Sequence, residues 1–174
     1  AECEATGLPT VSQDTCLNFR WVDLRTPANN AIFKVQSGVC QLFREYFYSQ
    51  RFVEIHTPKL IGGASEGGSN VFTLKYFGQN ACLAQSPQLY KQIAAACSGL
   101  DRVIEVGPVF RAENSNTHRH LCEFVGLDFE MVIIEHYYEV LDLMGNLFCY
   151  IFDKLKEHHH HELTTISQQY PFEP

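Results

Sequence analysis

Two long stretches of the chain carry apolar residues at helical spacing, which predicts two amphipathic helices. The first follows Thr26-Pro27, where threonine can cap a helix and proline suits its first turn, and it runs to about Gln50. The second runs from Tyr137 to about Glu157. The apolar positions are Ile32, Val35, Val39, Leu42 and Tyr46 in the first helix, and Val140, Met144, Leu147, Ile151 and Leu155 in the second.

Residues 122–134 alternate between apolar and polar side chains, which is typical of a strand whose two faces differ. The apolar face contains Val125, Leu127, Phe129 and Met131, and the other face contains Phe124, Gly126, Asp128 and Glu130. Because ionised carboxylates are rarely buried without partners, we expect this second face to lie against water or a ligand.

Shorter elements fill the region between the two long helices. The predicted strands, in chain order, are 52–55, 71–76, 81–84, 103–106 and 109–113. The second and third should form an antiparallel hairpin around Gly78-Gln79-Asn80, and Gly107-Pro108 should separate the last two. A short helix should follow Ser86-Pro87. Its face is lined by Leu89, Ile93 and Ala96.

The order of these elements predicts an α+β fold with an antiparallel sheet flanked by helices, because strands and helices do not alternate as βαβ units. Residues 1–18 are polar and should form a linker or a flexible N-terminal segment, whereas 19–174 should form one partial domain. Gly62 to Asn70 is rich in glycine and serine and should form a mobile loop. The chain has no P-loop and no GxGxxG string, so any ATP site would use neither of those routes.

Composition narrows the possible partners. The net charge is −7, so a nucleic acid would need a local basic surface, for which His118-Arg119-His120 is the small candidate. The chain has neither a run of apolar residues long enough to span a bilayer nor the start of a signal peptide, so we expect no membrane partner and a cytoplasmic location. Seven scattered cysteines without a CxxC pair favour free thiols over disulfides or zinc. The tract from His158 to His161 is better explained as a solvated helix end than as a tag or metal site.

Arg111 and Glu113 lie two residues apart on a predicted strand and therefore share a face. With Phe124, Asp128 and Glu130 they could line one groove, where a planar guanidinium suits a phosphate and an aromatic ring suits a stacked base. The alternative is an arginine–carboxylate bridge across the sheet, and composition alone favours that alternative.

A resemblance to a known family adds to this picture. Residues 107–131, GPVFRAENSNTHRHLCEFVGLDFEM, resemble motif 2 of the class II aminoacyl-tRNA synthetases, and FRAENSNTHRH resembles the aspartyl enzymes of eukaryotes and archaea. The resemblance implies that Arg111 holds the ATP α-phosphate, Glu113 binds the adenine amino group and His120 reaches a phosphate. It also implies that Phe124 stacks on adenine and that Asp128 lies near the amino group of the amino acid. Arg111, Glu113 and His120 would thus be the catalytic residues.

Two further segments carry the same resemblance. Residues 52–60, FVEIHTPKL, resemble motif 1, which would place Pro58 at a homodimer interface. Ser65-Glu66-Gly67-Gly68 resembles the flipping loop of the aspartyl enzymes, which would place Ser65 and Glu66 beside the amino acid.

The string QSPQLYK, residues 85–91, resembles the amino-acid pocket of the aspartyl enzymes. The resemblance implies that Gln88 contacts the backbone groups of the substrate and that Lys91 pairs with the side-chain carboxylate of aspartate. Such an ammonium would pair poorly with neutral asparagine.

The implied activity is that of an aspartate–tRNA ligase, with L-aspartate, ATP and tRNA(Asp) as its partners and substrates. Motif 3, the acidic ligands of Mg²⁺ and the anticodon-binding OB-fold of the family are missing from the sequence. We therefore expect a fragment of a longer protein that is inactive alone and has no metal ligands of its own. Three alternatives stay open: an asparaginyl or lysyl relative, a non-catalytic paralogue that binds tRNA or a regulatory partner, and an unrelated α+β domain.

Overall fold

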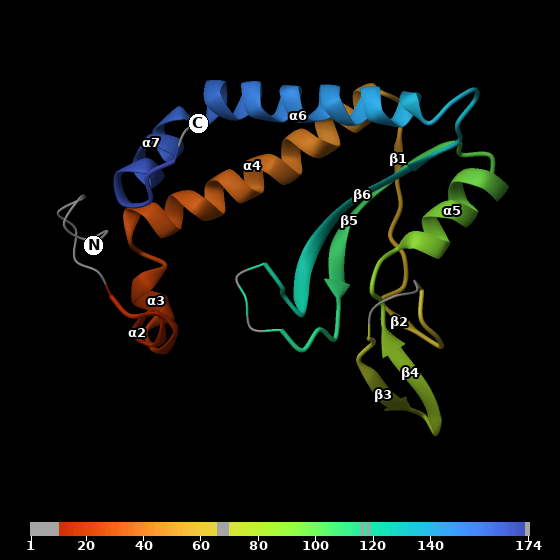
Figure 1. Ribbon diagram of the computed structural model, residues 1–174, viewed down its shortest axis with the longest axis horizontal. Helices are drawn as coiled ribbons and strands as arrows, with labels where there is room; N and C mark the ends of the chain where they lie inside the picture. Colours follow the sequence, from red (N-terminus) through yellow and green to blue (C-terminus); the bar gives the residue numbers. More distant parts are fainter. Residues whose placement is uncertain (1–10, 66–69, 116, 118, 173–174) are drawn as a thin grey trace. The chain divides into compact units, whose positions relative to one another are not determined.

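The computed structural model describes residues 11–65, 70–115, 117 and 119–172 (Figure 1). The helices are α2 (Gln13–Asn18), α3 (Arg20–Asp23), α4 (Pro27–Ser49), α5 (Gln88–Cys97), α6 (Tyr138–His158) and α7 (His160–Gln169). The strands are β1 (Val53–Glu54), β2 (Leu60–Ile61), β3 (Thr73–Tyr76), β4 (Gln79–Leu83), β5 (Arg102–Phe110) and β6 (Glu123–Met131). None of the helices within these ranges is long and apolar enough to cross a membrane.

The chain divides into two compact units. We call Ala1–Glu45 together with Met144–Pro174 the helical unit, and Tyr46–Leu143 the sheet unit. The fold class predicted from the sequence is therefore correct in its α+β character. The sheet unit contains every residue that the sequence singles out for chemistry.

The helical unit is held together by contacts of α4 with α6 and α7. Lys34 lies 3.7 Å from Glu162, and the Tyr150 hydroxyl donates to Glu45 over 3.5 Å. Gly38 is buried against the His159 ring, so closely that a Cβ at this position would lie 2.4 Å from Nε2. The buried residues of α6 are Leu147, Ile151 and Leu155, one turn apart, as the apolar pattern predicts. The same pattern placed Met144 on the buried face, but Met144 is 37 % exposed.

The structure corrects two expectations for these helices and adds one short helix. Ile32 on α4 is 39 % exposed. The face of α4 that is buried at this end of the helix carries smaller residues instead, such as Ala28 and Ala31. The Thr26 hydroxyl donates to the carbonyl of Asp23 instead of capping α4. The linker predicted for 1–18 contains α2, whose first turn is capped by Ser12; residues 1–10 lie outside the described residues.

The histidine tract lies where two helices meet. His158 ends α6 and His160 begins α7, so the predicted helix end is confirmed, although the sequence pattern did not predict α7. The solvated surface expected there does not extend to His159, which is partly covered where it meets α4. The six cysteines in the described part of the chain are free thiols.

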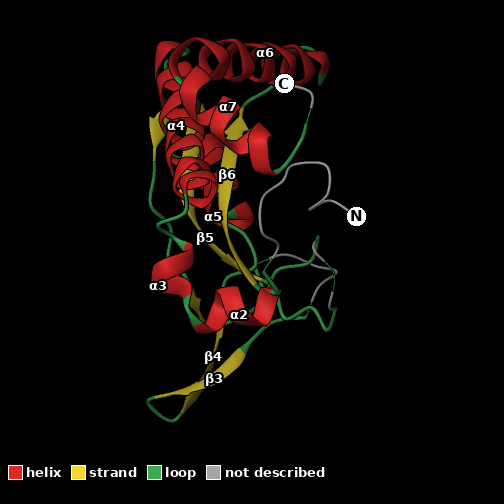
Figure 2. Ribbon diagram, turned by 90° about the vertical axis from the view of Figure 1, so that its left-hand side faces the viewer, coloured by secondary structure: helices red, strands yellow, loops and turns green. Residues whose placement is uncertain are grey.

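The sheet unit contains two three-stranded sheets with the orders β1-β5-β6 and β2-β4-β3 (Figure 1). Figure 2 shows β5 beside β6, and β3 beside β4. The second sheet and the β5–β6 pair are antiparallel, as expected, but β1 runs parallel to β5. In the β3–β4 hairpin, Phe77 and Gly78 form the two-residue turn with φ values of 46° and 81°. The turn thus lies one residue earlier than predicted, and its second position suits glycine because φ is positive.

Strand β5 continues through Gly107-Pro108, so the predicted interruption is wrong. Its residues pair with β6 in an unbroken register from Arg102 to Phe110. The amide of Phe110, two residues after Pro108, points away from β6 and donates to the carbonyl of Ala84. Pro108 therefore has its nitrogen on the side away from β6, where the ladder needs no donor.

Helix α5 packs against β5 and β6 on the face that carries Asp128 and Glu130. Its buried residues are Lys91 and Ala95, whereas Leu89 and Ile93 are both 51 % exposed. The predicted apolar face is therefore not the buried face. The carboxylates opposite explain the difference, because burying them requires a cation rather than leucine or isoleucine.

Candidate active site

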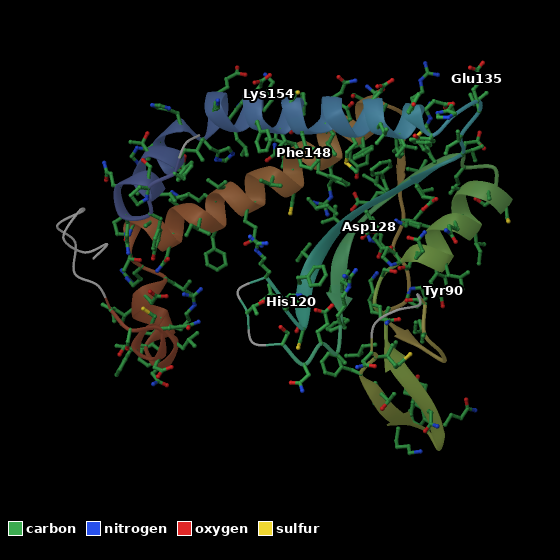
Figure 3. The ribbon with its side chains drawn as sticks, in the orientation of Figure 1. Tyr90, His120, Asp128, Glu135, Phe148 and Lys154 are labelled. Atoms are coloured by element: carbon green, nitrogen blue, oxygen red, sulfur yellow. The ribbon has the colours of Figure 1, made fainter. Side chains whose placement is uncertain are left out.

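Register places the chemically important residues on one face of the β5–β6 ladder. The opposed pairs on this face are Val103 with Glu130, Glu105 with Asp128, Gly107 with Gly126, and Val109 with Phe124. Beyond the last pair, Arg111 extends the ladder by donating its backbone N–H to Cys122. Figure 3 shows Asp128 in the middle of β6 and His120 near the loop end of the same ladder. The face thus runs from acidic residues through two glycines to an aromatic ring.

The acidic end of this face is closed by Lys91. Its Nζ lies 3.1 Å from Oδ1 of Asp128, 3.7 Å from Oε2 of Glu130 and 3.3 Å from the carbonyl oxygen of Phe129. Lys91 is only 8 % exposed. The sequence predicted Lys91 and Asp128 as pocket residues, and the structure brings them into direct contact. An amino acid carries an ammonium and a carboxylate, and this cluster offers a partner to each.

Two glycines form the middle of the face. A Cβ on Gly126 would lie 2.7 Å from Oδ2 of Asp128 and 2.9 Å from Cγ2 of Val109, and one on Gly107 would lie 3.2 Å from Oε1 of Glu105. Neither glycine has a positive φ. The need at Gly126 is therefore for space, since neighbouring side chains already fill the position of a Cβ. Along the strands, this flat section separates the charged cluster from Arg111 and Phe124.

At the other end, the guanidinium of Arg111 lies over the ring of Phe124, 5.4 Å from its centroid. The buried Nε of Arg111 has no hydrogen-bond partner in the described part of the chain. The described residues also include no ion pair between Arg111 and a carboxylate, so the bridge across the sheet is not what they form. The ring offers a face for stacking, and the guanidinium offers donors that suit a phosphate.

Glu113 and His120 meet on the loop between β5 and β6. Nε2 of His120 lies 3.9 Å from Oε2 of Glu113, and its Nδ1 lies 2.6 Å from the hydroxyl of Thr117. The His120 side chain is about half exposed, and that of Glu113 is more covered. Both predicted residues are therefore close to each other at the loop end of the face, where they can contact a ligand that enters from solvent.

The segment before α5 is anchored by one local hydrogen bond and by one from a distant part of the chain. The hydroxyl of Ser65 donates to the carbonyl of Ser86, and Oγ of Ser86 accepts from the amide of Gln88. Gln85 is fully buried, while Gln88 is partly exposed at the first position of α5. Glu66, predicted beside the amino acid, lies outside the described residues, as does His118 of the basic cluster.

Sequence reasoning missed Glu105, which is only 3 % exposed. Its carboxylate accepts hydrogen bonds from Lys59 and from the hydroxyl and the amide of Thr57. The sequence did contain an indication of its role. Glu105 is a lone acidic residue in an apolar strand, and it lies an even number of residues before Arg111, so both side chains point to the same face. Pro58 lies between the two partners of Glu105 and is exposed. Within the described ranges, no three His, Cys, Asp or Glu residues lie close enough to hold a metal ion.

Comparison with known proteins gives the same family as the resemblance seen in the sequence. The family described as tRNA synthetases class II (D, K and N) matches residues 12–173, and the chain belongs to this family. It is 63 % identical over 163 residues to aspartate–tRNA ligase 1, cytoplasmic, of Arabidopsis thaliana, covering 94 % of this chain and 30 % of that protein.

Solved structures agree with this assignment. The aspartyl-tRNA synthetase from Entamoeba histolytica matches with a TM-score of 0.79 and 52 % identity, covering 95 % of this chain and 30 % of that one. The asparaginyl-tRNA synthetase from Pyrococcus horikoshii, solved with asparaginyl-adenylate, matches with a TM-score of 0.82 and 33 % identity, covering 94 % of this chain and 38 % of that one. The chain thus spans about a third of the length of the relatives it matches, and its sequence is nearer to the aspartyl example.

Proposed function

We propose that the protein containing this chain is an aspartate–tRNA ligase. The observation that carries the proposal is the ammonium of Lys91, which is buried on the polar face of the ladder beside Asp128. A fixed cation suits a substrate with a carboxylate side chain and gives little to a neutral amide. High identity to a cytoplasmic aspartate–tRNA ligase from Arabidopsis thaliana supports the same substrate and a cytoplasmic location.

Substrate binding would exchange the partners of Lys91. The ammonium of aspartate would take the place of the lysine beside Asp128, which frees the Lys91 ammonium for the side-chain carboxylate of aspartate. The exchange replaces the ion pair between Lys91 and Asp128 by two ion pairs to the substrate, so neither Lys91 nor Asp128 is left without a partner when the substrate is buried. Gln88 would contact the backbone groups of the substrate, and Ser65 and Glu66 would lie beside it. Hydrogen bonds of this charged type contribute about 1.5–3 kcal/mol each.

The α-carboxylate would then lie over the two glycines, directed toward Arg111. A carboxylate oxygen attacks the α-phosphorus of ATP, the bond from that phosphorus to the bridging oxygen breaks, and aspartyl-adenylate and pyrophosphate form. Arg111 would hold the α-phosphate and stabilise its developing charge, and Phe124 would stack on adenine. Glu113 would bind the adenine amino group, and His120 would contact a phosphate.

In the second step, a hydroxyl of the terminal ribose of tRNA(Asp) attacks the carbonyl carbon of the adenylate and AMP leaves. Class II synthetases use ATP and Mg²⁺, but the described residues offer no metal-binding cluster, so they are given no role in binding Mg²⁺.

We further propose a homodimer in which the segment around Pro58 lies at the interface. Its exposed position between two anchored neighbours supports this proposal.

The test is ATP–pyrophosphate exchange by the full-length gene product, with aspartate and asparagine assayed side by side. Aspartate alone should support exchange. Exchange with asparagine would instead favour the asparaginyl alternative. The similarity to the asparaginyl-tRNA synthetase from Pyrococcus horikoshii shows that such an enzyme can have this fold. A folded protein that exchanges with neither amino acid would point to the non-catalytic paralogue.

A further inference from the structure

One buried carboxylate on the ladder has no part in the reaction proposed above. Oε1 of Glu105 accepts from Nζ of Lys59 over 2.6 Å and from the amide of Thr57 over 3.2 Å, and Oε2 accepts from the Thr57 hydroxyl over 2.7 Å. Nζ of Lys59 also donates to that hydroxyl over 2.9 Å. A buried charge with three protein donors is satisfied, so Glu105 needs no ligand of its own.

The three donors all come from the short segment between β1 and β2. That segment is in turn bonded to the chain that leads into α5, because the carbonyl of Lys59 accepts from the amide of Ala84 over 2.9 Å. The carbonyl of Ala84 then accepts from the amide of Phe110, the residue before Arg111. Glu105 thereby fixes a backbone path that ends where the pocket segment, residues 85–88, begins.

Glu105 also lies directly opposite Asp128 on β6. A free carboxylate at this place would compete with Asp128 for Lys91 and for the ammonium of a substrate. Lys59 removes that competition because it occupies Glu105 within the same network. Asp128 and Glu130 are then the carboxylates left to Lys91, at 3.1 and 3.7 Å.

We propose that Glu105, held by Lys59 and Thr57, is a positioning residue for the amino-acid half of the active site. It acts on the substrate in two ways. It anchors the segment before Gln88, and, because it is paired with Lys59, it does not compete with Asp128 for the ammonium of the substrate. The proposal rests on the function proposed above. Glu105 itself would touch neither aspartate nor ATP.

The experiment is Glu105→Gln in the full-length gene product, assayed by ATP–pyrophosphate exchange. The variant keeps the shape of the side chain but removes its charge, so the anchored segment loosens. Misplacement of about 1 Å in a substrate site can lower a rate about a hundredfold, and a partial loosening should raise the KM for aspartate by about tenfold. The KM for ATP should change much less, because Phe124 and Arg111 keep their own contact.

A second variant separates positioning from stability. Adding Lys59→Met to Glu105→Gln removes both charges of the pair, so thermal stability should recover relative to Glu105→Gln while the KM for aspartate stays high. If KM instead follows thermal stability through both variants, the role is purely structural and the proposal is wrong. Glu157→Gln is the matched control, since it breaks an exposed ion pair of the same 2.6 Å length and should leave both KM values unchanged.

The outcomes also separate this proposal from the proposed function. A folded wild-type protein without aspartate exchange refutes both the function and the role that depends on it. An active wild-type protein whose folded Glu105→Gln variant keeps the wild-type KM for aspartate refutes the positioning role alone. If Glu105→Gln does not fold, Thr57→Val decides, because it removes one donor to Oε2 and leaves both charges. A raised KM for aspartate then supports the role, and an unchanged KM refutes it.

Discussion

Adding one methyl group at Gly126 should selectively weaken aspartate binding. A Cβ there would lie 2.7 Å from Oδ2 of Asp128 and 2.9 Å from Cγ2 of Val109. Val109 is buried and stiff at χ1, so it cannot give way easily, whereas the carboxylate of Asp128 can rotate. The rotation moves Oδ1 away from Nζ of Lys91, to which it lies 3.1 Å in the wild type, and therefore from the place that the ammonium of aspartate would take on binding.

The size of the effect follows from what is lost. A hydrogen bond between charged groups contributes about 1.5–3 kcal/mol, which corresponds to about 10- to 150-fold in the KM for aspartate. Overpacking costs about 1–3 kcal/mol of stability, and the lower backbone entropy of the unfolded alanine variant returns only about 0.4–1 kcal/mol. Gly126→Ala should therefore also be destabilised, by about 1 kcal/mol.

The assay is ATP–pyrophosphate exchange by the full-length protein, with KM measured for aspartate and ATP separately. Gly145→Ala is the control, because nothing lies within 4 Å of a Cβ at that helical position. It should leave KM unchanged and stabilise the protein by about 0.5–1 kcal/mol. A wild-type KM for aspartate in Gly126→Ala, or an equal rise in the KM for ATP, would refute the reasoning.

The other predictions concern single charges. Arg111→Ala should lower the exchange rate by about 10²–10³-fold, because the α-phosphate loses its stabilising donor, and near-normal exchange would contradict that role. Lys91→Met should raise the KM for aspartate by about 10- to 150-fold without improving exchange with asparagine; an unchanged KM would show that the ammonium does not bind the substrate. The N–H groups of Glu135 and His136 donate to the carboxylate of Glu139 and lower its pKa from 4.5. The resulting stability is present above pH 4.5 and is lost as the pH falls through the lowered pKa, so thermal melts of Glu139→Gln should decline less steeply in acid than those of the wild type.

Much of the fold follows from local patterns. The helical spacing of apolar residues gives α4 and α6 nearly to their observed ends, and alternation gives β6 with its acidic face. The FRAENSNTHRH and QSPQLYK strings lead to the right family, and the period of two places Phe124, Asp128 and Glu130 together. These features depend on neighbours within a few residues, and such neighbours are visible in a sequence.

Tertiary structure alone decided which faces are buried and which distant residues meet. Helix α5 buries Lys91 rather than Leu89 because Asp128, 37 residues later in the chain, needs a cation. Glu105 finds its partner Lys59 at a separation of 46 residues, which no local pattern encodes. The parallel pairing of β1 and the continuity of β5 through Pro108 likewise depend on which strand edge has a partner. The sequence by itself thus determined most of the elements and the kind of chemistry, whereas the cost of burying a charge without a partner determined how the site is assembled.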